Sequence, residues 1–296
     1  MTVAQLDSLI TLLTSRPAPE TPDVGLSRAR YEKLAAVLGG APDAKCEKVD
    51  AGGVAAEWVA APGFDPERSV LYLHGGGYAI GSISTHRRMA YDISAACGAR
   101  VLVIDYRLAP EHPFPAAVDD AAKAWRWLLQ QGFRPSRLSI AGDSAGGGLT
   151  IATLVNLRDL KLALPACAVA ISPWVDLEGI GNSMTARSAQ DPMVQKDGLL
   201  WMADMYLNGK DAKTPLAAPL HADLKGLPPV LIQVGSAETL LDDATRIAEK
   251  MHTAGVEVRL AVWPNMVHVF PFFAPVLSEG RDGCLEIGTF IRGHTA

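Results

Sequence analysis

Residues 138–148 of this sequence read LSIAGDSAGGG, a short apolar stretch that runs directly into a group of small residues. The stretch 138–141 is typical of a buried strand, because strands covered on both faces lose the regular alternation of apolar and polar residues. The glycines that follow permit a tight turn, and a helix is predicted from Ser144 to about Asp159. A strand, a sharp turn and a helix in this order indicate a parallel α/β sheet.

The same alternation continues on both sides of this segment. Strands are predicted at 46–49, 55–60, 69–73, 101–104, 166–171, 230–234 and 256–263. Helices are predicted at 85–97, 116–130 and 198–207. Gly52-Gly53 separates the first two strands and is a hairpin signal. The pattern therefore predicts a mostly parallel sheet with helices on both faces.

Two segments depart from the alternation. Residues 1–45 show helical spacing at Leu6, Ile10 and Leu13 and again over 28–38, with proline-rich breaks between. Residues 175–222 separate two strands by a long insertion, and insertions of this length in a domain are usually functional. We predict a main domain over 46–296 and a helical cap built from 1–45 and 175–222.

Composition narrows the class of protein. Of 296 residues, 49% are apolar and 20% are charged, with a formal net charge of −5, which excludes intrinsic disorder and argues against nucleic-acid or polybasic membrane partners. There is no apolar run of about 18 residues, and the N-terminus lacks the basic region of a signal peptide. Four scattered cysteines favour reduced thiols over a disulfide framework or a metal site: Cys46, Cys97, Cys167 and Cys284. We expect a cytoplasmic protein.

Ser144 is a candidate nucleophile. It is the central residue of GDSAG at 142–146, which matches the pattern G-x-S-x-G. A predicted strand before it and a helix of small residues after it form the strand–turn–helix of a nucleophile elbow, which exposes the serine hydroxyl at a helix N-terminus. The alternative is a serine that caps a helix in a glycine-rich turn. The sequence context favours the nucleophile.

A glycine run, His74-Gly75-Gly76-Gly77, follows the predicted strand 69–73. Attack of a serine on an acyl group creates an oxyanion, and unobstructed backbone N–H groups can stabilise it. The HGGG motif of lipases and esterases supplies such donors together with the N–H of the residue after the nucleophile, here Ala145. A flexible loop is the alternative. A phosphate-binding loop would require Gly-Lys-Ser/Thr, which is absent here.

Three motifs in this order resemble the hormone-sensitive-lipase family of α/β-hydrolases, in its bacterial carboxylesterase branch, also called family IV. They are YLHGGGY at 72–78, DYRLAPEHPFPAA at 105–117 and GDSAGG at 142–147, within a resemblance that spans about 54–290. The resemblance implies an α/β-hydrolase fold with a helical cap and a catalytic domain over 46–296. It also implies oxyanion donors at Gly76, Gly77 and Ala145. His74, Gly75, Asp143 and the 105–117 segment would support the site.

The family order of nucleophile, acid and base places the base near the C-terminus. His268, in PNMVHVF at 264–270, follows the last predicted strand, where the family base stands. His74 belongs to the glycine motif. The remaining histidines have no comparable context: His86, His112, His221, His252 and His294.

The acid follows the strand 230–234, where the family shows Gly-x-x-Asp-Pro-Leu. This chain has Gly235-Ser236-Ala237-Glu238-Thr239-Leu240, so Glu238 occupies the acid position and Thr239 replaces proline. Glutamate is a known third member of such triads. The rivals Asp242 and Asp243 lie one helical turn further on, where charges on a solvated face are expected.

These residues predict a serine carboxylesterase that acts on short- to medium-chain esters through an acyl-enzyme, without metal or organic cofactor. Apolar residues of the motif and the cap are expected to line the substrate pocket: Tyr78, Met193, Leu200, Trp201, Met205 and Tyr206. A lactone or amide hydrolase with the same triad remains an alternative. So does a non-catalytic receptor on this fold, although His268 argues against it.

The strand 256–263 is the last of the predicted sheet and alternates Val256, Val258, Leu260 and Val262 with charged or small residues. A terminal strand has unpaired N–H and C=O groups, which proteins cover or use. We therefore expect a homodimer that pairs this edge across a two-fold axis, as the family resemblance also implies.

Overall fold

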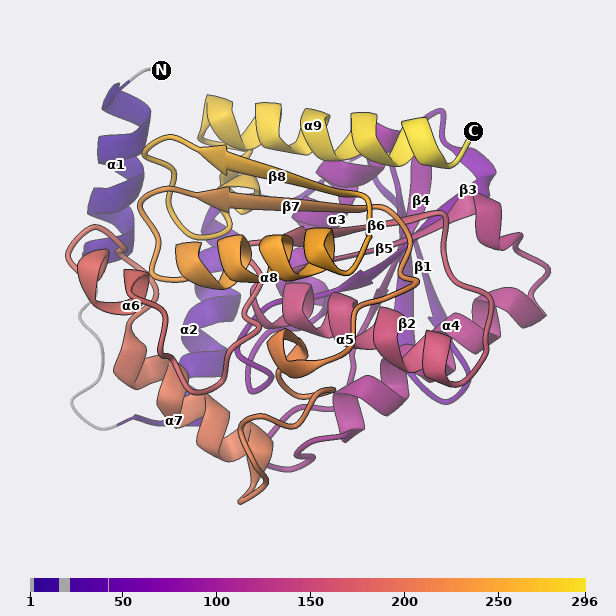
Figure 1. Cartoon of the computed structure of the whole chain (residues 1–296). Coiled ribbons are helices and arrows are strands. Elements are labelled where there is room, and N and C mark those ends of the chain that lie inside the picture. Colours follow the sequence, from indigo (N-terminus) through magenta and orange to yellow (C-terminus); the bar gives the residue numbers. More distant parts are fainter. Residues whose placement is uncertain (1–2, 16–21, 42) are drawn as a thin grey trace.

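A computed structural model describes residues 3–15, 22–41 and 43–296. Its described residues form one eight-stranded sheet in the order β1-β2-β4-β3-β5-β6-β7-β8 (Figure 1). The strands are β1 Lys45–Asp50, β2 Ala55–Ala60, β3 Asp65–Leu73, β4 Ala99–Ile104, β5 Leu138–Asp143, β6 Cys167–Ile171, β7 Val230–Gly235 and β8 Val258–Trp263. The pairs β1–β2 and β2–β4 are antiparallel, and the other neighbouring pairs are parallel. The predicted fold class is confirmed.

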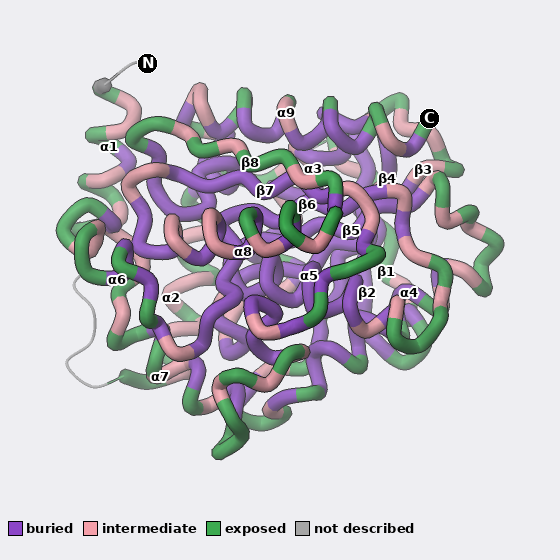
Figure 2. Tube along the Cα trace, viewed as in Figure 1, coloured by how far each residue is buried: buried purple, intermediate pink, exposed green. Residues whose placement is uncertain are grey.

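Helices cover both faces of the sheet. On one face lie α3 (Ile83–Cys97) and α9 (Ser278–His294), and on the other α4 (Ala116–Gln130), α5 (Ala145–Asp159) and α8 (Leu241–Thr253). Successive residues of β3 enter different cores, with Val70 and Tyr72 in one and Leu71 and Leu73 in the other. The sheet is therefore buried on both sides (Figure 2), which explains its continuous apolar strands.

Two of these helices, α8 and α9, are not among the helices predicted from the sequence, and α9 shows why. The α9 sequence, SEGRDGCLEIGTFIRGH, contains four glycines, which lower helix propensity. It nonetheless packs along α3, with Ile287 and Ile291 fully buried. Packing against the sheet and α3 stabilises a helix that its local sequence does not favour.

The cap helices gather at the carboxyl ends of the strands, toward which β7 and β8 point in Figure 1. They are α2 (Val24–Val37), α6 (Ser183–Ala186) and α7 (Lys196–Leu207). Arg28 of α2 donates to both carboxylate oxygens of Glu111, at 2.8 and 2.7 Å, and to the carbonyl of Ala79. The 105–117 segment thus anchors α2 on the main domain. The proline-rich break at 16–21 lies outside the described residues.

The first helix, α1 (Val3–Thr14), contacts the main domain at the start of α9. The Gln5 side chain accepts hydrogen bonds from the N–H and hydroxyl of Ser278, and Leu9 is buried in the core beneath α9. All four cysteines are unpaired, and three of them are buried. Among the described residues, no helix combines the length and apolar content that a membrane crossing requires.

Candidate active site

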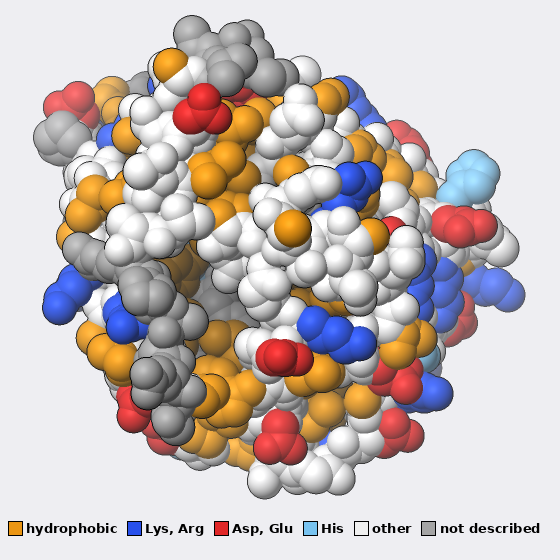
Figure 3. All heavy atoms as spheres, turned by 90° about the vertical axis from the view of Figure 1, so that its left-hand side faces the viewer, with side chains coloured by type: hydrophobic (Ala, Val, Ile, Leu, Met, Phe, Trp, Pro, Cys, Tyr) orange, Lys and Arg blue, Asp and Glu red, His pale blue; other side chains and the backbone are white. Residues whose placement is uncertain are grey.

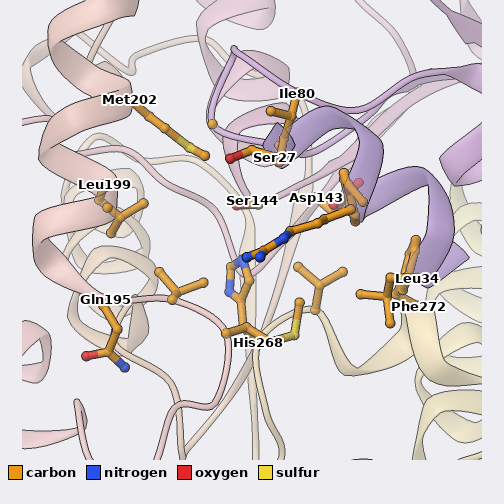
Figure 4. A pocket seen from close by; sticks show the side chains of 18 of the residues that line it. Ser27, Leu34, Ile80, Asp143, Ser144, Gln195, Leu199, Met202, His268 and Phe272 are labelled. Atoms are coloured by element: carbon orange, nitrogen blue, oxygen red, sulfur yellow. The ribbon is translucent and has the colours of Figure 1, made fainter. Parts of the chain in front are cut away.

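Ser144 lies in the turn between β5 and α5. Its backbone has φ 54° and ψ −121°, a conformation that costs free energy for any residue except glycine. A side chain at Gly142 would collide with the carbonyl of Gly146, and one at Gly146 with the carbonyl of Leu73. The two glycines of the motif therefore permit the elbow to form against β3, and Ser144 lines a pocket beside His268 (Figure 4).

His268 and Glu238 form a buried pair on two neighbouring loops. The loop after β7 carries Glu238, and the loop after β8 carries His268. Nδ1 of His268 donates to Oε2 of Glu238 at 2.7 Å, and the two side chains are 4% and 0% exposed. The other carboxylate oxygen of Glu238 accepts from the Ser172 hydroxyl and the N–H of Gly235. Three donors thus hold the carboxylate in one orientation.

The charge of Glu238 changes the acid–base behaviour of His268. Burial opposes the charged imidazolium, but the hydrogen bond and negative charge of Glu238 outweigh it, and the pKa of His268 is raised above its ordinary value. Asp191 and Asp143 act in the same direction from further away. Once His268 has accepted a proton, the negative charge of Glu238 stabilises the imidazolium.

Ser172 is a residue of the site that the sequence analysis does not identify. Its hydroxyl donates to Glu238 and accepts a hydrogen bond from the N–H of Val269, next to His268. It follows β6 and has φ 45°. No motif surrounds it in the sequence, so only the convergence of three loops reveals its place.

The glycine run after β3 lies beside the elbow. Gly76 and Gly77 line the pocket that contains Ser144, and Ala145 is the first residue of α5, where N–H groups have no acceptor within the helix. A side chain at Gly77 would collide with the sulfur of Met202 on α7. The Met202 side chain is flexible, and the left-handed backbone of Gly77, with φ 59°, is the stronger reason for a glycine at this position.

Asp143 joins the elbow to the glycine run. Its carboxylate accepts from the Tyr72 hydroxyl at 2.7 Å and from the N–H of Gly75 at 3.0 Å, and it lies 3.4 Å from Nε2 of His86. His74 bonds through Nδ1 to the carbonyl of Gly75. Burial, assisted by the charge of nearby His86, lowers the pKa of His74 to about 3. A neutral His74 therefore supports this loop as a donor.

The pocket has a volume of about 340 Å³. Two cap helices contribute to its wall in the same way, each through residues at helical positions i, i+3, i+4 and i+7. These residues are Ser27, Arg30, Tyr31 and Leu34 of α2, and Gln195, Gly198, Leu199 and Met202 at α7. Figure 3 shows the corresponding face of the molecule, hollowed near its centre and with hydrophobic side chains around the hollow.

Most of the predicted pocket residues lie elsewhere. Met193 lines the pocket, but Tyr78, Leu200, Trp201, Met205 and Tyr206 are not among its lining residues. The rings of Tyr78 and Tyr206 stack at 3.8 Å and are each 1% exposed, so they belong to the core beneath the cap. The prediction identified the correct helix and the wrong face of it, because the face that α7 turns toward Ser144 depends on tertiary packing.

The expectation of a solvated face for Asp242 and Asp243 is wrong for Asp243. This carboxylate is 0% exposed and accepts from the N–H groups of Val175 and Asp176, each at 2.9 Å. Burial raises the pKa of Asp243 to about 7. Asp243 thus anchors the start of the cap insertion on α8 and makes no hydrogen bond to His268.

Among the described residues, one group has the spacing of metal ligands, with donor atoms of Asp176, Glu178 and His221 within 4.8 Å of one another. Arg246 pairs with Asp176 at 2.7 Å, and Lys213 lies 3.5 Å from Glu178. These cations already balance the two carboxylates. The group is part of an ion-pair network between the cap and α8, and it does not line the pocket.

Comparisons with known proteins agree with this fold. A family profile described as "alpha/beta hydrolase fold" matches residues 70–272. An acetyl-hydrolase of Streptomyces hygroscopicus is 46% identical over 90% of this chain and 89% of that protein. The crystal structure of an esterase from the bacterial hormone-sensitive lipase family is 46% identical, covers 100% of both chains and has a TM-score of 0.98. A crystal structure of EstE5 soaked with p-nitrophenyl butyrate is 47% identical over 98% of both chains, with a TM-score of 0.95.

Proposed function

This chain belongs to the α/β-hydrolases, in their hormone-sensitive-lipase family, and we propose that it hydrolyses short- to medium-chain carboxylic esters with Ser144, His268 and Glu238 as its triad. One observation supports this most: Ser144 and His268 share the wall of an apolar pocket, and Glu238 holds the opposite nitrogen of His268. The acetyl-hydrolase and esterase names of the relatives support the same class of reaction.

In the first step, Oγ of Ser144 attacks the ester carbonyl carbon, and Nε2 of His268 accepts the hydroxyl proton. The carbonyl oxygen becomes an oxyanion, which the N–H groups of Gly76, Gly77 and Ala145 stabilise. Glu238 holds the imidazole in the tautomer whose Nε2 lone pair faces the serine, and it stabilises the imidazolium that forms.

In the second step, His268 returns the proton to the leaving alkoxide, the bond from carbon to alkoxide oxygen breaks, and the acyl group stays on Ser144. Water then attacks the acyl-enzyme while His268 accepts its proton. Collapse of this second intermediate releases the carboxylic acid and restores Ser144. Every proton transfer uses Nε2 of His268.

The test is a rapid-mixing experiment with p-nitrophenyl butyrate. We expect a burst of p-nitrophenol close to the enzyme concentration, followed by steady turnover, provided that deacylation is the slower step. Steady turnover without a burst would still fit an esterase with rapid deacylation, and binding without turnover would identify a receptor. Matched lactone and anilide substrates should give much lower kcat/KM than the ester. A higher value for either would identify the alternative hydrolase.

Activity should decline as the pH falls. Only a neutral His268 accepts the serine proton, and its pKa is raised, so the acid limb of kcat/KM should have its midpoint above the ordinary histidine value of about 6.5. Below the midpoint, the rate should fall about tenfold per pH unit. The measurement is kcat/KM for an aryl ester at a series of pH values between about pH 5 and pH 9. A flat profile down to roughly pH 5 would exclude His268 as the base.

Short acyl chains should be preferred. The cavity of about 340 Å³ lies at the lower end of the usual size of small-ligand sites, and the Met202 side chain lines it close to Gly77. We expect kcat/KM for acetyl to hexanoyl p-nitrophenyl esters to exceed that for palmitoyl esters by roughly 10²-fold or more. Equal values across the series would show that the pocket does not limit chain length.

The homodimer remains a proposal, and it concerns β8. This strand forms one edge of the sheet, and Leu260 and Val262 are 38% and 42% exposed on it. Pairing two copies of this edge would cover these side chains and satisfy the free backbone groups. We expect light scattering at micromolar concentration to give a dimer and a Val262→Lys variant to give a monomer. A monomeric wild-type protein would contradict the proposal.

A further inference from the structure

The loop that carries Glu238 is held by the cap on both sides. On one side, the hydroxyl of Ser183, at the start of α6, donates to the carbonyl of Thr239 at 2.6 Å. On the other side, Thr239 donates to Asp191, which lies in the cap segment before α7. The residue directly after the candidate acid therefore contacts two separate parts of the cap.

Asp191 joins this loop to the pocket wall. It is 3% exposed, and its Oδ2 accepts from the N–H of Thr239 at 2.9 Å and lies 3.2 Å from the Thr239 hydroxyl. Its Oδ1 accepts from the N–H groups of Met193 and Val194, each at 2.9 Å. Both of these residues line the pocket with His268. One carboxylate thus fixes two neighbouring parts of the site relative to each other.

The chemistry of residue 239 permits this contact. Threonine offers both a backbone N–H and a hydroxyl, and the hydroxyl can also reach the carbonyl of Val194 at 3.3 Å. A proline at this position would have no N–H to donate. Because Asp191 is buried, each donor that is lost would leave part of its charge unsatisfied.

We propose that Asp191 and Thr239 form a positioning pair, which holds Glu238 on Nδ1 of His268 and sets the pocket wall at Met193 and Val194 by the same contact. The pair acts through Glu238 and touches no reacting atom, so the inference rests on the proposed ester hydrolysis. Its consequence is that substrate-pocket geometry and triad geometry depend on each other in this chain, since Asp191 belongs to the cap and Thr239 to the main domain.

Asp191 also contributes charge. His268 faces three carboxylates, Glu238 at hydrogen-bond distance and Asp191 and Asp143 further away, and each raises the pKa of His268. Arg30 of α2 lines the same pocket, and His86 lies next to Asp143. Removing the charge of Asp191 should therefore move the midpoint of the acid limb of kcat/KM to lower pH. The loss of a purely structural anchor would not move this midpoint.

The first experiment is a graded series at position 239. Thr239→Ser keeps both donors and should stay within about twofold of wild-type kcat. Thr239→Val keeps the N–H alone and should lose roughly threefold. Thr239→Pro loses both donors and should lose about tenfold to a hundredfold, because small misplacements of catalytic groups are costly. Wild-type kcat and acid limb in a folded Thr239→Pro enzyme would overturn the inference.

The second experiment is the pH profile of Asp191→Asn. Asparagine has one acceptor oxygen, so it can serve only one of the two donor pairs, and it carries no charge. We expect kcat to fall about tenfold or more. We also expect the midpoint of the acid limb of kcat/KM to move down by roughly half to one pH unit. An unchanged acid limb would overturn the inference. If this variant or Thr239→Pro fails to fold by circular dichroism, Thr239→Val compared with Thr239→Ser decides, and equal kcat would overturn it.

Wild type and Ser144→Ala are assayed in parallel. If wild type does not hydrolyse the ester, or Ser144→Ala retains activity, the proposed function fails. If both behave as expected and the Asp191 and Thr239 variants match wild type, only the positioning pair fails.

Discussion

Ser144→Ala is expected to reduce ester hydrolysis by about 10³ to 10⁶ in kcat. The variant removes the oxygen that attacks the ester in the first step of the proposed mechanism, while the N–H groups of Gly76, Gly77 and Ala145 remain. Any residual rate would come from water acting in a site that still binds substrate. The measurement is steady-state hydrolysis of p-nitrophenyl butyrate, with contaminating esterase activity kept below the residual rate expected for the variant.

The fold should be unaffected by this change. Alanine lacks only the hydroxyl, and residue 144 keeps its unusual backbone because Gly142 and Gly146 still permit the close approach to β3. Ser188→Ala is a matched control, since among the described residues the hydroxyl of this cap serine donates to the carbonyl of Thr185 and the residue does not line the pocket. It should keep wild-type kcat. A Ser144→Ala enzyme with more than about a tenth of wild-type activity would refute the assignment.

The sheet could be predicted because its signals are local. The predicted strands and the helix 116–130 agree with the structure to within a few residues, since buried parallel strands are short apolar runs bounded by turn residues. The helix α9 could not be predicted in this way, because its glycines conceal the pattern and packing on α3 stabilises it. Local sequence thus determined the centre of the fold better than its outer layer.

The candidate site likewise contains residues that the sequence predicts and residues that it does not. Ser144, Glu238 and His268 each lie in the turn or loop after a strand, so motif and chain order predict them. In the structure Ser144 and His268 line one pocket, and Glu238 bonds to His268. The pocket face of α7 was mispredicted because one turn of a helix offers several apolar faces. Ser172 and Asp191 have no motif, and their places depend on loops that meet only after folding.

Glu238→Gln is expected to lower kcat by roughly 10² to 10⁴ with a modest change in KM. Three donors converge on this carboxylate: the Ser172 hydroxyl and the Gly235 N–H on Oε1, and Nδ1 of His268 on Oε2. A glutamine has one acceptor oxygen, which the first two donors would retain. Its NH₂ group would then face Nδ1 of His268 and require it to accept. The imidazole proton would move to Nε2, the nitrogen that faces the serine, and His268 could no longer act as the base.

Two further variants make this result specific. Glu238→Asp keeps the charge but shortens the side chain by one methylene, about 1 Å of reach, so it should be partly active at best. Asp242→Asn keeps the size of a carboxylate whose one bond, among the residues that the structure describes, is to the N–H of Ser183, and it should cost far less in kcat. Asp243→Asn should act mainly on thermal stability, because this buried carboxylate anchors Val175 and Asp176. The carboxylate of Asp242 accepts from the N–H of Ser183, whereas that of Glu238 bonds directly to His268. A crippled Asp242→Asn enzyme beside a nearly normal Glu238→Gln enzyme would therefore show that Glu238 is not the acid.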